Sequence, residues 1–191
     1  AAFIAEPVQG AGGVIVPPAS FWPRLRELLD KHEILLISDE VVTGFGRSGS
    51  MFGARGWGVK PDIMCLAKGI TSGYIPLGAT VLNERVMNAW TKGVDPMGFI
   101  MHGYTATGHA LGCAAAIAAL NIVEKEDLPA NAAAMGARLM KGLEDLPNWS
   151  SLVGEVRGKG LMVGVDMVAD KGTREPIDPG KGQGELIAAF A

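Results

Sequence analysis

Two short apolar segments, each ending at charged residues, constrain the fold of this chain more than any other feature. Residues 34–37 are Ile-Leu-Leu-Ile and lead into Asp39 and Glu40, whereas residues 63–67 are Ile-Met-Cys-Leu-Ala and lead into Lys68. Apolar segments of this length, bounded by turn residues, are typical of buried parallel strands. Because α/β proteins bind ligands where such strands end, we expect the acid and the amine at one edge of the sheet. A buried acid facing a buried amine is costly, so this pair predicts a bound group between them.

The segment between the two strands, residues 44–49, is Gly-Phe-Gly-Arg-Ser-Gly and predicts a loop, because it is too rich in glycine for a helix or strand interior. An apolar strand ending in Asp-Glu also resembles the Walker B strand of ATPases. That interpretation requires a G-x-x-x-x-G-K-[ST] loop, which the sequence lacks, and Lys68 precedes its glycine. The ATPase hypothesis is therefore poor.

The remaining apolar periodicity predicts an α/β unit followed by part of a smaller α+β unit. A buried strand at 2–5, a helix from a Ser20 cap to His32 and the strand at 34–38 predict a right-handed crossover. We also expect strands at 77–82, 152–156 and 161–168, and helices at 84–90, 109–124 and 129–146. The helix at 109–124 is apolar nearly all round and should be buried. The polar segment after it predicts domains at 1–124 and 125–191.

Two of these helices have an amphipathic pattern. The apolar faces consist of Trp22, Leu25, Leu28 and Leu29 in the first helix, and of Met135, Leu139 and Leu143 in the last. The strands at 152–156 and 161–168 should be joined through Arg157-Gly158-Lys159-Gly160.

Composition and charge argue against several classes of function. The net charge is −3 and the 17 lysines and arginines are scattered, which disfavours a nucleic-acid partner. No apolar segment is long enough to span a bilayer, and the N-terminus lacks the basic segment of a signal peptide. Cys65 and Cys113 form no metal-binding pair and are expected to be buried, reduced thiols. We therefore expect a cytoplasmic protein with no metal and no membrane partner.

Asp39 and Lys68 each allow an ordinary interpretation and a chemical one. An acid after a strand is usually a cap or an ion-pair partner, and a single lysine is usually a solvated charge. Lys68, however, follows five apolar residues, and desolvation lowers the pKa of an amine, which makes it a nucleophile that can form a Schiff base. Pyridoxal phosphate requires such a lysine, and its ring nitrogen requires an acid to remain protonated. The pair therefore favours a pyridoxal-phosphate site.

Several motifs, taken in order, resemble one family. Residues 36–47, Leu-Ile-Ser-Asp-Glu-Val-Val-Thr-Gly-Phe-Gly-Arg, together with Pro-Asp-Ile at 61–63 and Ala-Lys-Gly at 67–69, resemble the class III pyridoxal-phosphate aminotransferases. Residues 5–10, Ala-Glu-Pro-Val-Gln-Gly, and 102–105, His-Gly-Tyr-Thr, resemble two further motifs of that family. The resemblance covers nearly the whole chain and is nearest to the ω-aminotransferases. It implies fold type I, with a mixed sheet in a large domain and part of a small C-terminal domain.

The resemblance implies a role for each of several residues. Lys68 would bear the Schiff base and move the substrate proton, and Asp39 would hold the ring nitrogen while Val41 packs against one ring face. Thr105 would contact the cofactor phosphate of the neighbouring subunit, so the working form would be a homodimer with a shared active site. The reaction would transfer an amino group from an amine or ω-amino acid to a keto acid such as pyruvate.

Glu6 and Gln9 would lie on the substrate side, although Glu6 could instead cap its own turn. Arg47 could steady the glycine loop or an interface, His102 is expected to make loop hydrogen bonds, and His32 is expected to be a solvated helix end. None of these three is expected to be catalytic.

The sequence also departs from the family pattern. Val42 stands where many members have glutamine, and His109-Ala110 stands where relatives usually have a residue followed by proline. The phosphate-binding loop, the stacking aromatic and the carboxylate-binding arginine of the family lie in segments outside this sequence, and residues 44–49 do not replace that loop. We therefore expect a fragment that lacks N-terminal and C-terminal segments and is inactive when isolated. The alternatives are a class III decarboxylase or aminomutase, or an inactive truncated α/β domain of the family.

Overall fold

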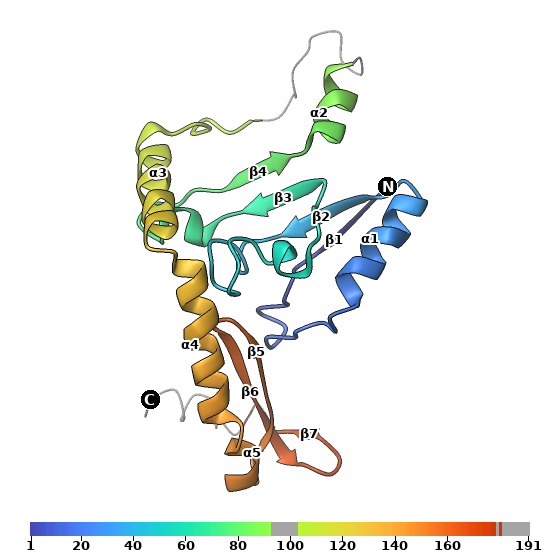
Figure 1. Ribbon diagram of the computed structural model, residues 1–191, viewed down its shortest axis with the longest axis vertical. Coiled ribbons are helices and arrows are strands. Elements are labelled where there is room, and N and C mark those ends of the chain that lie inside the picture. Colours follow the sequence, from blue (N-terminus) through green and yellow to red (C-terminus); the bar gives the residue numbers. More distant parts are fainter. Residues whose placement is uncertain (93–102, 179, 181–191) are drawn as a thin grey trace.

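The computed structural model describes residues 1–92, 103–178 and 180 of the chain, which form two sheets joined by two long helices (Figure 1). The first sheet has the order β1 (Ala2–Ala5), β2 (Leu35–Asp39), β3 (Ile63–Leu66) and β4 (Ala79–Leu82). The first three strands are parallel and β4 pairs antiparallel with β3. This mixed sheet with flanking helices confirms the expected α/β class.

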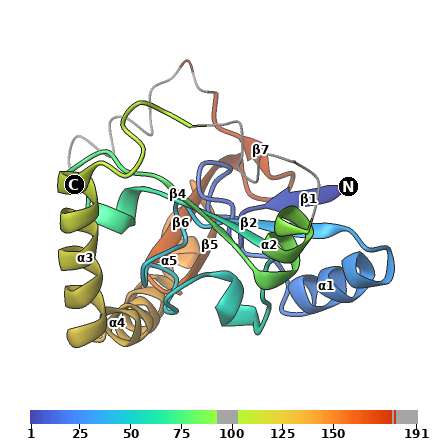
Figure 2. The same ribbon diagram turned by 90° about the horizontal axis from the view of Figure 1, so that it is seen from above.

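One face of the first sheet carries the core. Leu36 and Leu66 lie on this face, because the register pairs Ser38 with Met64 and strand residues alternate in direction. The buried clusters are Trp22, Leu29, Leu36 and Val59 beneath α1 (Phe21–Lys31), and Leu66, Ile70 and Ala116 beneath α3 (Ala110–Lys125). Figure 2 shows α1 and α3 at opposite ends of the view, with the first sheet between them.

Three expectations about this part of the chain are wrong in detail. β1 is exposed, with Ile4 at 59%, because it forms the edge of the sheet and its outer face is uncovered. Helix α1 begins at the predicted place, but the Ser20 side chain makes no cap hydrogen bond. Leu28 is 54% exposed because only Trp22 and Leu29 of this helix reach the core fully.

Helices α3 and α4 (Leu128–Leu143) lie end to end along one side of the molecule and connect the two sheets (Figure 1). Helix α3 is not buried all round as predicted, since Leu111 and Ile117 are 63% and 61% exposed. Its inward face consists mostly of small residues, which allow a close approach to the segment after β3. That face consists of Gly112, Ala116, Ala119 and Val123.

The second sheet is antiparallel and consists of β5 (Val153–Lys159), β6 (Met162–Asp170) and β7 (Glu175–Pro176), preceded by the short helix α5 (Leu146–Trp149). The connection predicted at residues 157–160 is mostly strand, because β5 extends to Lys159 and only Gly160 and Leu161 form the turn. Helix α4 buries Ala132 and Gly136 instead of the predicted large residues, because its close approach to the sheet admits only small ones. Met135 and Leu139 are 41% and 42% exposed, respectively.

The remaining elements are α2 (Glu84–Thr91), η1 (Ala54–Trp57) and η2 (Lys68–Thr71). Helix α2 begins where the sequence predicts, and the side chain of Asn83 caps it by accepting a hydrogen bond from the Val86 amide at 3.0 Å. The division into domains 1–124 and 125–191 falls at the junction of α3 and α4 and stays a prediction. Within the described ranges, no helix has both the length and the apolar character needed to cross a membrane.

Candidate active site

The predicted acid and amine lie at the ends of neighbouring strands. Asp39 is the last residue of β2 and is in register with Cys65 of β3. Lys68 follows three residues after Cys65 and opens the short helix η2. Because β2 and β3 are parallel, both groups are delivered to the same edge of the sheet, as the sequence predicted.

The carboxylate of Asp39 retains an available oxygen atom. The side chain is half-buried, and its Oδ1 accepts a hydrogen bond from the Val41 amide at 3.0 Å. In the part of the chain that the structure describes, Oδ2 accepts no hydrogen bond, and Asp39 forms no ion pair with Lys68 or with any other residue. Of the two ordinary roles, Asp39 therefore caps its own turn through the Val41 amide but is not an ion-pair partner among the described residues, and Oδ2 can accept a proton-bearing ligand nitrogen.

Lys68 has an unusual backbone and an accessible side chain. Its φ of 46° lies in the left-handed region, which costs a non-glycine residue about 1–3 kcal/mol and is found often at functional sites. Ala67 accepts a hydrogen bond from the Ile70 amide at 3.1 Å, which closes the turn around Lys68. The burial expected for Lys68 is wrong for this chain, because η2 turns Ile70 and Thr71 inward and leaves Lys68 exposed.

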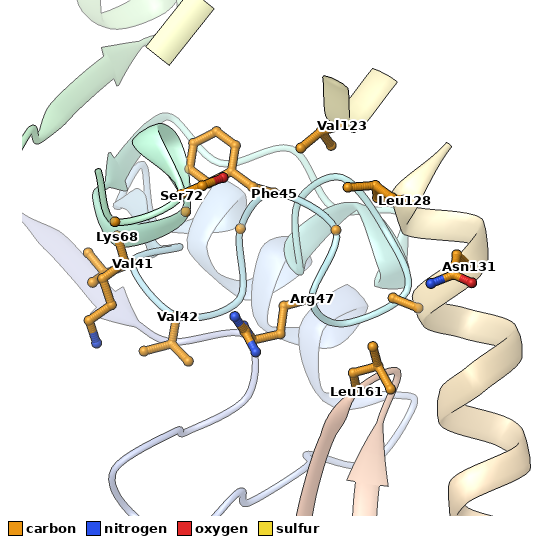
Figure 3. Close-up of a pocket in the computed structure, with 15 residues that line it drawn as sticks. Val41, Val42, Phe45, Arg47, Lys68, Ser72, Val123, Leu128, Asn131 and Leu161 are labelled. Carbon is orange, nitrogen blue, oxygen red and sulfur yellow. The ribbon is translucent and has the colours of Figure 1, made fainter. Parts of the chain in front are cut away.

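A pocket of about 770 Å³ extends from Lys68 to helix α4. Figure 3 shows Lys68 and Val41 at one end of it, Leu128 and Asn131 at the other, and Arg47 between them. Lys68 and Arg47 are the only charged side chains among its described lining residues, and Asp39 is not one of them. Two cations in a mainly apolar lining favour an anionic group, such as a phosphate or a carboxylate.

The glycine-rich segment 44–49 forms a loop, as predicted, and its glycines contact α4. Gly46 and Gly49 have φ values of 97° and 85°, which favour glycine. A Cβ atom at Gly46 would lie 3.3 Å from Pro129, and one at Gly49 would lie 3.1 Å from the Cβ of Ala133. The loop therefore serves the junction with α4.

Glu6 and Gln9 belong to a turn that touches the pocket. The carboxylate of Glu6 accepts a hydrogen bond from the Gly10 amide at 2.9 Å, which is the turn cap of the alternative interpretation. A Cβ at Gly10 would lie 3.2 Å from the side chain of Val42, which lines the pocket. Gln9 is exposed and its backbone pairs with Ile15. The substrate-side role of Glu6 and Gln9 stays a prediction.

Thr105 lies in an exposed turn just before α3. Within the ranges described, no hydrogen bond joins it to Asp39 or Lys68, so its role toward a neighbouring subunit stays a prediction. His102 lies outside the described residues. His109 caps α3 by accepting a hydrogen bond from the Gly112 amide at 3.2 Å, so the departure from the family pattern leaves the helix start capped.

Sequence reasoning did not single out Glu40, which the structure buries completely beside Asp39. A signal was present, because strand residues alternate and Glu40 must face away from Asp39, toward the core. Polar residues at Ser38 and Thr43 could have supplied its partners. The thiol of Cys65, in register with Asp39, has a raised pKa, first because of burial and second because of the negative charge of Asp39.

The solved structures similar to this chain are transaminases of fold type I. The sheet of this chain, with an acid and a lysine after neighbouring parallel strands, has the same fold. The family described as aminotransferase class III matches residues 1–191, and the chain therefore belongs to the class III aminotransferases. An amine transaminase from an uncultivated Pseudomonas species, solved in its PLP-bound form, is 65% identical with a TM-score of 0.93. The match covers 95% of this chain and 41% of that one.

Curated relatives extend this similarity. An uncharacterized aminotransferase from Sinorhizobium fredii is 48% identical over 93% of this chain and 38% of its own length. A putrescine–pyruvate aminotransferase from Pseudomonas aeruginosa is 45% identical over 97% of this chain and 40% of its own length. The chain thus spans about 40% of the length of the relatives that it matches.

Proposed function

We propose that the protein containing this chain is a pyridoxal-phosphate-dependent transaminase. In our proposal it moves an amino group from an amine or ω-amino acid to a keto acid such as pyruvate. The observation that carries the proposal is the pair Asp39 and Lys68 at the ends of neighbouring parallel strands, without an ion pair between them in the described structure. The names of the putrescine–pyruvate relative and of the amine transaminase support the substrate class.

The residues present fit pyridoxal phosphate. Asp39 offers Oδ2 to a protonated ring nitrogen, Lys68 offers an accessible amine without an ion-pair partner in the described ranges, and Val41 lines the pocket beside Lys68. When bound, the cofactor supplies an electron sink for the bonds to the substrate carbon. Asp39 would keep the ring nitrogen protonated, and the amine of Lys68 would first bind the cofactor covalently and then take and return the substrate proton.

We further propose a homodimer in which α3 contributes to the interface. Three large apolar residues of α3 are more than half exposed, and exposed apolar surface on a helix favours a contact with another protein surface. They are Leu111, Ile117 and Ile122. Thr105 lies in the turn before this helix, five residues ahead of Ala110, so the same contact would carry it toward the partner's cofactor phosphate. The two free thiols support our proposal of a cytoplasmic location, where thiols stay reduced.

The experiment uses the holoenzyme that contains this chain. Borohydride reduction of the yellow holoenzyme should fix the cofactor on Lys68, as seen by peptide mapping. Lys68→Ala should abolish amine-to-pyruvate transfer, whereas Lys60→Ala, at an exposed position that does not line the pocket, should leave transfer unchanged. An adduct on a different lysine, or transfer by Lys68→Ala, would show that the nucleophile is wrongly assigned.

A further inference from the structure

The carboxylate of Glu40 has no exposed surface and accepts four hydrogen bonds. Oε1 accepts from the hydroxyl of Ser38 at 3.1 Å and from the amide of Ala54 at 2.9 Å. Oε2 accepts from the hydroxyl of Thr43 at 2.5 Å and from the amide of Gly53 at 2.7 Å. Each oxygen atom therefore binds one hydroxyl group and one backbone amide.

No lysine or arginine forms an ion pair with Glu40 in the part of the chain that the structure describes. A buried acid without a counter-ion is costly unless donors occupy its lone pairs, and here four neutral donors do so. The four donors belong to the end of β2, the turn that follows it and the beginning of η1, which is 13 to 14 residues away in sequence. Glu40 thus joins three segments at one buried point.

The backbone of this same turn orients the acid of the site. Glu40 donates its amide hydrogen to the Cys65 carbonyl at 3.0 Å, and its own carbonyl accepts from the Gly44 amide at 2.9 Å. Between these two anchors lies Val41, whose amide donates to Oδ1 of Asp39 at 3.0 Å. The position of the Val41 amide, and with it the direction of the Asp39 carboxylate, therefore depends on how firmly Glu40 holds the turn.

We propose that Glu40 is a positioning residue for the transaminase reaction: from the opposite side of the sheet it fixes the turn that aims Asp39 at the ring nitrogen. The proposal rests on the proposed function. Glu40 is fully buried and does not line the pocket, so its effect on the reaction would pass through the Val41 amide to Asp39. Glu40→Gln should disturb this link, because in either orientation its NH₂ group faces a backbone amide, and that amide cannot become an acceptor.

The test compares Glu40→Gln with Asp62→Asn in the holoenzyme. Asp62 is also a buried acid bound to β2, through the Leu36 amide at 2.8 Å, but none of its bonds involves the turn after Asp39. Both variants should lower the thermal midpoint of the cofactor-free protein. Only Glu40→Gln should also weaken cofactor binding about tenfold and lower kcat roughly 10- to 100-fold, which is the effect expected of a small misplacement. The KM for pyruvate should change less than kcat.

Equal cofactor affinity and equal kcat in the two variants would overturn the proposal and leave Glu40 a purely structural residue. If Glu40→Gln does not fold, Thr43→Val removes a single donor and must lower kcat and cofactor affinity in the same direction, though by less. Unchanged values for Thr43→Val would overturn the proposal as well. Failure of the proposed function is distinguishable, because the unaltered protein would then form no borohydride-fixed adduct at Lys68.

Discussion

Replacing Asp62 with asparagine should destabilise the protein in a way that depends on pH. Asp62 is only 5% exposed and connects α1, β2 and the cap of α2. Its Oδ2 accepts from the Leu36 amide at 2.8 Å and from Arg26 at 2.9 Å, and its Oδ1 accepts from Asn83 at 2.9 Å. An asparagine has one acceptor oxygen, so one side of this network must be lost.

The loss at neutral pH follows from the network. With its oxygen in the place of Oδ2, the introduced asparagine would keep the Leu36 amide and Arg26 but would direct its NH₂ group at the NH₂ of Asn83. Asn83 cannot turn over without losing its bond from the Val86 amide. Hydrogen bonds to charged groups contribute about 1.5–3 kcal/mol each, and the weakened pairing with Arg26 adds to the loss. We expect a decrease of about 2–4 kcal/mol in the free energy of unfolding.

The pH dependence follows from the pKa of Asp62. Burial is the largest influence and raises this pKa, but the hydrogen bonds from Leu36, Arg26 and Asn83, with the charge of Arg26, together outweigh it and lower the pKa. A carboxyl group whose pKa is lower in the folded state stabilises the fold above its unfolded value, about 3.9 for Asp, and loses this effect as the pH falls through the folded value. The difference between the two proteins should therefore be constant from about pH 7 to pH 5 and shrink below about pH 4.

Urea unfolding at several pH values measures this difference. The matched control is Asp30→Asn, which removes the charge of the other acidic partner of Arg26, at 2.6 Å. Asp30 is 59% exposed, so this pair should contribute no more than about 1 kcal/mol. Equal losses for the two variants, or a loss for Asp62→Asn that grows as the pH falls, would refute the reasoning.

Two further predictions concern α4 and the thiol beside the site. Gly136→Ala should destabilise the protein strongly, because the added Cβ would lie 2.0 Å from the carbonyl oxygen of Gly160. Gly142→Ala should instead stabilise it by up to about 1 kcal/mol, because a Cβ at this helical position would have nothing within 4 Å. Thermal unfolding compares the two variants, and similar midpoints would contradict this packing. The raised pKa of Cys65, from burial first and the charge of Asp39 second, should make its alkylation slow at about pH 8 and faster as the pH rises. Asp39→Asn should accelerate alkylation at that pH, which mass spectrometry of the Cys65 peptide measures, and an unchanged rate would argue against the influence of Asp39.

The elements that the sequence predicts well are those whose signals are local. The apolar segments before Asp39 and Lys68 form two parallel strands, because short apolar runs bounded by turn residues have few other stable forms. The start of α2 at residue 84 is predicted for the same reason, since Asn83, which caps it, binds an amide only three residues away. The placement of Asp39 and Lys68 at one sheet edge follows from strand direction alone.

The errors concern burial, which depends on what covers a surface. Helix α3 has an apolar sequence nearly all round, yet its buried face consists mostly of small residues and Ile117 is left exposed. Helix α4 turns Gly136 to the second sheet, because the turn at Gly160 approaches too closely for a larger side chain. A periodicity argument assigns the largest residues to the core, and it cannot detect an interface where close approach selects the smallest ones.

The segment after β2 combines three tasks, and the direction of each side chain separates them. Asp39 faces the site with an available oxygen atom, and Glu40 faces the core, where its carboxylate accepts four hydrogen bonds. Gly46 and Gly49 face helix α4. Substitutions in this one segment should therefore have different consequences: loss of chemistry at Asp39, loss of positioning at Glu40, and loss of the helix contact at the two glycines. The acid that follows Asp39 in sequence consequently belongs to the support of the site, because alternation along a strand directs it away from the ligand.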